Sequence, residues 1–225
     1  MLEPAPHAEL MRSLGRLVRG LSALFWGLPL TLLVSVKTGV SEWLKPMGML
    51  PPLISMGILL YGLILLSSFQ KQERIWIRAI DRAKLLAVIN IGLAPFIFWW
   101  NKLPFVPFYS ATIGILILSG VLFLFDLNQV LQRLAAMLPD ETLRLETKWF
   151  TSVNLGMLIF LVSAAAVYVA LDQIDHLPAV LVQALQTIEP GRVITLLILL
   201  PLALTMTLIW KIKEVIIRSV FNAQS

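Results

Sequence analysis

Residues that could act as acids, bases or metal ligands are few in this sequence. No Asp, Glu, Lys, Arg or His lies inside its long apolar segments. The two histidines are His7 and His176, and the chain has no cysteine. Thiolate chemistry and metal or haem sites held by paired helix histidines are therefore excluded within this chain. We expect no catalytic residue, no metal site and no cofactor, and we do not expect an enzyme.

Two asparagines are the most notable polar residues inside the apolar segments, and each comes two residues before a glycine. Asn90 precedes Gly92 and Asn154 precedes Gly156, while Gly27 takes the place of these glycines in the first apolar segment. The asparagines could line a polar path for a solute. They could also hydrogen-bond between helices that approach closely at glycine. The second interpretation is favoured, because small and polar residues in membrane helices usually mark contacts between helices.

The apolar residues form blocks long enough to cross a bilayer. Hydrophobic residues make up 58% of the chain and charged residues 14%, whereas soluble domains have about 45–50% and about 25%. A helix needs about 20 apolar residues to cross the hydrocarbon core, and in lipid its backbone must satisfy its own hydrogen bonds. Six blocks come close to this length: residues 20–36, 47–69, 85–100, 108–125, 149–171 and 193–210.

These blocks predict an all-α integral membrane protein with six transmembrane helices in a single membrane domain, residues 19–222. Residues 1–18 form an N-terminal tail and 223–225 the C-terminal end. The first and third blocks are short, so they either extend into their flanks or lie in a locally thinned bilayer.

The lysines and arginines predict the orientation. Most of them fall in alternate parts of the chain, namely the N-terminal tail, the second and fourth connections and the C-terminal tail. The other connections carry only Lys37, Lys45, Lys102 and Arg192. Because cytoplasmic loops carry the excess of cations, both termini are expected in the cytoplasm of a cell with the chain in its plasma (inner) membrane.

Amphipathic stretches follow the second, fourth and sixth blocks. After the fourth, an apolar stripe of leucines and valine faces away from a polar side that includes Asn128 and Arg133. Such stretches either lie in the headgroup layer or continue out of the membrane as packed helices. Their basic residues are expected to contact anionic lipids: Lys71, Arg74, Arg78, Arg82, Lys84, Lys211, Lys213 and Arg218.

The odd-numbered blocks begin alike, which suggests an internal repeat. Arg19, Lys84 and Lys148 each come eight residues before one of the glycines named above. The repeats would be three helical hairpins, residues 19–83, 84–147 and 148–222, each with a cytoplasmic amphipathic helix. Topology alone also places a cation near each entry, and glycine is common in membrane helices, so chance similarity is the alternative.

Taken together, these features favour a non-catalytic subunit or scaffold of a membrane protein complex. Its partners would be membrane lipids and other proteins or further copies of itself. The alternative is a transporter or channel for a small neutral or lipidic solute. Nucleic acid is not expected, because the basic stretch 71–84 is interleaved with isoleucine and tryptophan, as in a membrane-surface helix.

Overall fold

The computed structural model describes residues 6–38, 45–70, 73–103, 105–138, 140–172 and 190–222. Every regular element in these ranges is helical. The elements are α1 (Pro6–Lys37), a 3-10 turn (Lys45–Met47), α2 (Leu50–Ser67), α3 (Arg74–Leu93), α4 (Pro95–Lys102), α5 (Pro107–Ala136), α6 (Glu141–Asp172) and α8 (Pro190–Asn222).

Five helical segments are long and apolar enough to cross a membrane, which indicates a multi-pass membrane protein. They are Met11–Lys37, Leu50–Ser67, Arg74–Lys102, Pro107–Ala136 and Glu141–Ala164. The sixth apolar block, residues 193–210, lies within α8. The side chains of 193–197 fall outside the described ones, so a sixth span remains a prediction.

Prolines begin or interrupt several of these helices. Pro51 and Pro52 lie in the first turn of α2, as expected of residues that lack an N–H there. Pro29 and Pro201 lie inside α1 and α8. The sequence predicts a kink at Pro95, and the structure interrupts the helical segment Arg74–Lys102 there: α3 ends at Leu93, α4 begins at Pro95, and Ala94 between them keeps helical dihedral angles. The reason is that proline offers no N–H to continue the helical ladder.

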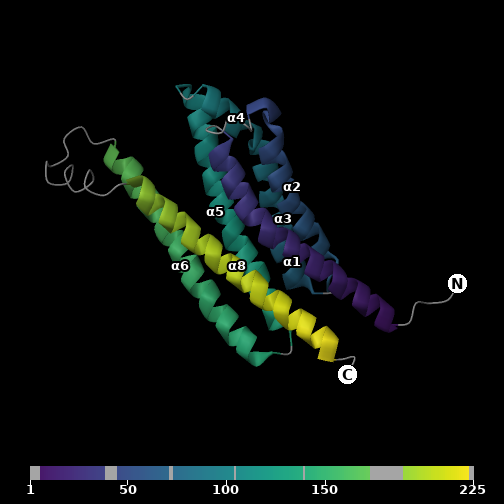
Figure 1. Ribbon diagram of the computed structural model, residues 1–225. Coiled ribbons are helices and arrows are strands. Elements are labelled where there is room, and N and C mark those ends of the chain that lie inside the picture. The colour runs from purple at the N-terminus through teal and green to yellow at the C-terminus, as the bar shows by residue number, and fades with distance from the viewer. Residues whose placement is uncertain are drawn as a thin grey trace.

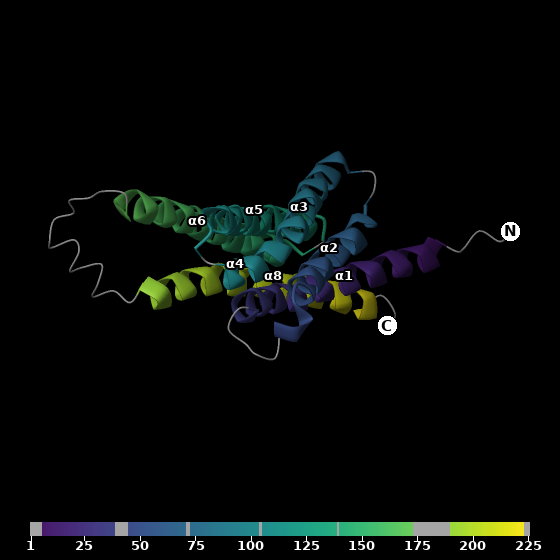
Figure 2. The same ribbon diagram turned by 90° about the horizontal axis from the view of Figure 1, so that it is seen from above.

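The long helices form a closed ring with alternating directions. Along the chain α1 packs on α2, α2 on α3, α3 on α5, α5 on α6 and α6 on α8, and α8 closes the ring on α1. Seen from above, α3, α5 and α6 form one layer and α1, α2 and α8 the other (Figure 2). The start of α1 and the end of α8 lie at the same end of the bundle (Figure 1), which we call the basic end.

The basic end takes its name from the cations that the topology gathers there. The helix parts at this end are the starts of α1, α3 and α6 and the ends of α5 and α8. They carry Arg12, Arg16, Arg19, Arg74, Arg78, Arg82, Lys84, Arg133, Arg144, Lys148, Lys211, Lys213 and Arg218. Residues far apart in the sequence thus share one charged end.

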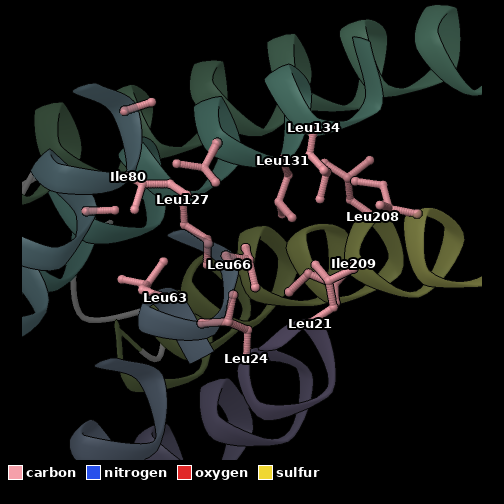
Figure 3. Close-up of a cluster of buried hydrophobic side chains, with 14 of the residues drawn as sticks. Leu21, Leu24, Leu63, Leu66, Ile80, Leu127, Leu131, Leu134, Leu208 and Ile209 are labelled. Carbon is pink, nitrogen blue, oxygen red and sulfur yellow. The ribbon is translucent and has the colours of Figure 1, made fainter. Parts of the chain in front are cut away.

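The main hydrophobic core lies between the two layers, in the half of the bundle nearer the basic end. Leucines and isoleucines from α1, α2, α3, α5 and α8 point toward one another there, among them Leu21, Leu63, Ile80, Leu127 and Leu208 (Figure 3). All five are at most 2% exposed. Burying a side chain of this size contributes about 1.5–3 kcal/mol in water, and here it also excludes lipid from the centre.

The amphipathic stretches belong to the long helices rather than forming separate elements. Residues 74–84 open α3, residues 126–136 end α5 and residues 211–222 end α8. Their apolar stripes are part of the main core, including Trp76, Leu131 and Ile212, all fully buried. This packing fits the interpretation in which these stretches continue the spans as packed helices.

The closest approach between helices is that of α1 and α2. A Cβ added to Gly20 would come within 2.8 Å of the carbonyl oxygen of Gly62, and one added to Gly62 within 3.0 Å of that of Gly20. Gly27 sits in the same interface, where an added Cβ would lie 2.8 Å from Leu59. Only glycine lets the two backbones come this near.

Candidate functional site

The most polar part of the described interior is a seam where α6 meets α5 and α8. Most of α6 is exposed, and it packs through a narrow stripe with one residue per turn. Three polar members of this stripe, Thr147, Thr151 and Asn154, are at most 1% exposed. The helix packs against α5 and α8, and Asn154 contacts Asn128 of α5 and Thr205 of α8, which are also buried. We call these five residues the polar seam.

Asn154 is the hub of the hydrogen bonds in the polar seam. Its Nδ2 lies 2.8 Å from Thr205 Oγ1, 3.0 Å from Asn128 Oδ1 and 3.2 Å from the carbonyl oxygen of Pro201. Asn128 Nδ2 in turn donates to Thr205 Oγ1 at 2.9 Å and to the carbonyl oxygen of Leu124 at 2.8 Å. One amide group therefore ties together three helices.

Other polar atoms of the seam have no hydrogen-bond partner. They are Thr147 Oγ1, Thr151 Oγ1 and Asn154 Oδ1. By contrast, Thr205 of the seam and Thr112 on α5 donate to the carbonyl oxygen four residues earlier. An unpaired buried polar group costs about 1–3 kcal/mol, so the seam holds unused hydrogen-bonding capacity.

The polar seam is bounded by leucines along α6. Leu143 precedes it and is 3% exposed, and Leu158 follows it and is 1% exposed. Beyond Leu158, no described side chain of α6 is buried. Along this helix the polar groups therefore form a short buried segment between apolar neighbours.

Asn90 lies elsewhere, and the structure does not bring it together with Asn154. It sits on α3, which packs against α2 and α5, whereas α6 packs against α5 and α8. Asn90 is 7% exposed, and its Oδ1 has no hydrogen-bond partner. The buried hydroxyl of Ser119 on α5 also lacks one. Both asparagines are thus interior residues, but only Asn154 makes bonds between helices.

The three glycines of the suggested repeat have different surroundings. Gly27 is packed against α2, as described above. An added Cβ at Gly92 or Gly156 would meet nothing within 4 Å, and both residues lie on exposed faces. Only Gly27 thus fits the helix-packing role expected for all three.

The basic residues expected to contact lipid differ in their surroundings. Four are paired with neighbours: Arg82 with Gln129 and Asp126, Lys84 with Asp81, Lys211 with Glu146 and Arg218 with Glu214. Arg74 and Arg78 are exposed, and the described residues include no ion-pair partner for them. Lys213 lies over the ring of Trp210, and Lys71 lies outside the described residues.

Asn128 is the residue that the sequence placed wrongly. The leucine stripe of this stretch predicts that Asn128 lies on the opposite, polar side, yet it is 1% exposed and bonded to α6 and α8. The physical reason is that α5 is covered on more than one face, by α3 and by α6 and α8. A single stripe of periodic leucines reveals only one of these contacts.

The described residues contain no group of three or more His, Cys, Asp or Glu side chains that could hold a metal ion. Comparison of the chain with protein-family models, with curated proteins and with solved structures finds no match. The packing, the charges and the polar seam are therefore the features that bear on function.

Proposed function

We propose that the chain is a non-catalytic, six-span subunit or scaffold of a membrane protein complex. Asn154 carries the proposal, because its amide on α6 bonds to two other helices of its own chain, α5 and α8, instead of facing an open path. The leucines that bound the polar seam and the filled core beside it point the same way. On this proposal the buried polar groups hold the bundle together, and the outer faces meet lipid or partners.

The outer faces of the bundle supply the surface that such a role needs. Large apolar side chains are exposed on every long helix, for example Trp26, Tyr61, Val88, Ile117 and Phe160. Hydrocarbon or another membrane helix can cover such faces without cost, whereas water cannot. Protein partners and self-association are both part of the proposal, and nucleic acid is not.

The orientation is proposed from the gathered cations. Since one end of the bundle carries most of the lysines and arginines, we place it in the cytoplasm, with the chain in the plasma (inner) membrane. Both termini are then cytoplasmic, and α8 is the sixth span. The amphipathic ends of α3, α5 and α8 would project at the cytoplasmic face and contact anionic lipids.

The order of the hairpins around the closed ring supports the proposed threefold repeat, but the three hairpins differ in local structure. Hairpins α1–α2, α3–α5 and α6–α8 each contact the next, as three repeated units in a ring would. The repeats differ where Pro95 divides the second and where only the first packs at its glycine.

The second candidate is a transporter or channel for a small neutral or lipidic solute. The observation that favours it is the set of buried oxygen atoms without a hydrogen-bond partner on Thr147, Thr151 and Asn154. Asn90, on α3 at the other side of α5, has one more such atom. A solute with hydroxyl or amide groups could satisfy them. This candidate requires the helices to separate along the polar seam, because Leu143 and Leu158 are buried at its ends.

Purification from the native membrane in mild detergent tests the choice between the two. The scaffold proposal expects the chain to co-purify with stoichiometric protein partners or as an oligomer. A stable monomer without partners would contradict it. The transport candidate is tested separately, by solute uptake into vesicles that contain the purified chain.

A further inference from the structure

From the basic end, charged side chains extend further along the bundle on the flank formed by α3 and α5 than on the flank formed by α6 and α8. Three contacts align the helices. Arg82 Nη2 on α3 lies 3.0 Å from Gln129 Oε1 and 3.8 Å from Asp126 Oδ1 on α5. Asn128, between those two residues of α5, bonds to Asn154 of α6. Arg82 and Asn154 are therefore at the same level of the bundle.

On the α6–α8 flank this level is already apolar on the outside. Trp149 and Trp210 are 67% and 54% exposed, and each is next to a lysine, as interfacial tryptophans often are. Asn154 lies about 7 Å along α6 beyond Trp149 at 1.5 Å per residue. Its outward-facing neighbours are Val153 and Ile159, both exposed.

On the α3–α5 flank the same level is still charged. The side chains of Asp81 and Arg82 are 62% and 59% exposed, and Lys84 follows. The first large apolar side chain to be exposed after them is Leu85, at 61%. The change from charged to apolar surface therefore comes about two helical turns further along the bundle on this flank.

A short apolar stretch accompanies this shift. Residues 85–100, in α3 and α4, cover at most about 24 Å at 1.5 Å per residue, while a typical hydrocarbon core is about 30 Å thick. Bilayers thin locally beside a short hydrophobic stretch, at a cost of only fractions of a kcal/mol per Å. Thinning also keeps Arg82 and its neighbours out of hydrocarbon, where a charge is costly.

We propose that the leaflet at the basic end is thinned along the α3–α5 flank, and that anionic phospholipid headgroups lie there beside Arg78 and Arg82. Their phosphates are about two helical turns deeper than those beside Lys148 and Lys211 on the other flank. The inference rests on the membrane topology proposed above, and it adds a binding surface with a defined class of ligand.

The charges of this flank fit an anionic headgroup. Asp81 is paired with Lys84 and Asp126 with Arg82. Arg74 and Arg78 are exposed, and the described part of the chain offers them no ion-pair partner. The surface is therefore left with a positive charge, and a phosphate that accepts hydrogen bonds from arginine neutralises it.

Because the chain has no cysteine, single cysteines report the depth directly. Asp81→Cys on α3 and Val153→Cys on α6 form the matched pair at the level of Arg82. Leu145→Cys, on α6 between Trp149 and the basic end, is the control that water should reach. Leu118→Cys, in the middle of α5, is the control that lipid should protect. Each protein is reconstituted in phosphatidylcholine–phosphatidylglycerol vesicles and treated with a membrane-impermeant maleimide.

We expect Asp81→Cys to react as completely as Leu145→Cys, while Val153→Cys stays as unreactive as Leu118→Cys. Equal reaction at Asp81 and Val153, or reaction at neither, would overturn the proposal. If Asp81→Cys does not fold, Arg82→Cys, at the level of Asn154, makes the same comparison with Val153→Cys. An inverted topology would only change the side from which Leu145→Cys and Asp81→Cys react, and the comparison of depth would still hold.

The ligand is tested by native mass spectrometry of the same reconstituted protein. The double variant Arg74→Gln/Arg78→Gln should lose bound phosphatidylglycerol relative to the unaltered chain, while Lys102→Gln at the opposite end should retain it. Retention equal to that of the unaltered chain in the double variant would show that these arginines hold no headgroup, and would refute this part of the proposal.

Discussion

At the scale of single residues, Asn154 and Asn90 are a natural pair for comparison. Replacing Asn154 by leucine removes the donor that links Asn128 and Thr205, and it leaves their polar atoms with fewer partners. We expect Asn154→Leu to lower the free energy of unfolding in detergent by about 1 kcal/mol, as for other hydrogen bonds between membrane helices. Titration with a denaturing detergent, followed by circular dichroism, measures the change.

Asn90→Leu is the matched control, since Asn90 is buried and its side-chain oxygen has no hydrogen-bond partner to lose. Its stability should equal or exceed that of the unaltered chain, because an unpaired polar oxygen is removed. If Asn90→Leu destabilised the chain as much as Asn154→Leu, the role assigned to the polar seam would be wrong.

Asp140 gives a prediction for pH. Its carboxylate accepts hydrogen bonds from the hydroxyl of Thr142 and the backbone N–H of Leu143 at the start of α6, and these bonds lower the pKa of Asp140. A carboxyl with a lowered pKa in the folded state contributes stability above its unfolded pKa and loses it as the pH falls through the folded pKa. Asp140→Ala should therefore lower the thermal midpoint at pH 7, and the difference should shrink below about pH 4.

Asp140→Asn is the control for this effect, because asparagine also caps helix starts but does not ionise. Its thermal midpoint should stay nearer to that of the unaltered chain at pH 7. A difference between Asp140→Ala and the unaltered chain that persisted at low pH would show that ionisation of Asp140 is not the cause.

Which residues would be buried was only partly predictable from the sequence. Asn154 lies within an apolar block, so an interior position on a helix follows from the cost of exposing an amide to lipid. Asn128 lies beside charged residues, and nothing local indicates that α6 and α8 cover it. Its partners Asn154 and Thr205 are 26 and 77 residues away in the sequence, and such contacts depend on how the helices pack.

At the scale of elements, the α1–α2 interface is the most sensitive to volume. In Gly20→Ala the new methyl group would meet Leu66 and the carbonyl oxygen of Gly62, which is backbone and cannot move aside cheaply. We expect a loss of about 1–3 kcal/mol in the free energy of unfolding, as for other overpacked sites. The same detergent titration measures it.

Gly92→Ala is the control, because its methyl group would meet nothing within 4 Å. Alanine favours the helix over glycine by about 1 kcal/mol, so this variant should be neutral or slightly stabilised. A loss of stability in Gly92→Ala equal to that in Gly20→Ala would contradict the difference in packing described for the two glycines.

The elements themselves were largely predictable, because the length of an apolar block and the absence of water around it require a helix. Five of the six blocks coincide with segments long and apolar enough to span. The interruption of the helical segment Arg74–Lys102 at Pro95 agrees with the predicted kink, because a proline inside a membrane helix removes one N–H from its hydrogen-bond ladder. The close contact at Gly20 was not predicted, because its partner Gly62 lies 42 residues away and no local pattern pairs the two glycines.

At the scale of the whole molecule, the ring is closed by contact between the first and last helices. The rings of Phe25 on α1 and Trp210 on α8 are 5.7 Å apart, and the two helices pack along each other. No periodicity in the sequence could indicate this contact, because the two residues belong to opposite ends of the chain. It decides whether the three hairpins form a ring or an open row.

Cross-linking tests the closure in the membrane. With Phe25→Cys and Trp210→Cys in the cysteine-free chain, a short bifunctional maleimide should link α1 to α8 within one molecule, and the product should migrate faster in denaturing gels. Phe25→Cys with Trp149→Cys is the control, because Trp149 is exposed on α6, which lies beyond α8 in the ring. An equal yield from both pairs, or a link only between molecules, would show that α8 does not close on α1. The main core would then lose the face that α8 provides, and the bundle would need a partner helix in its place.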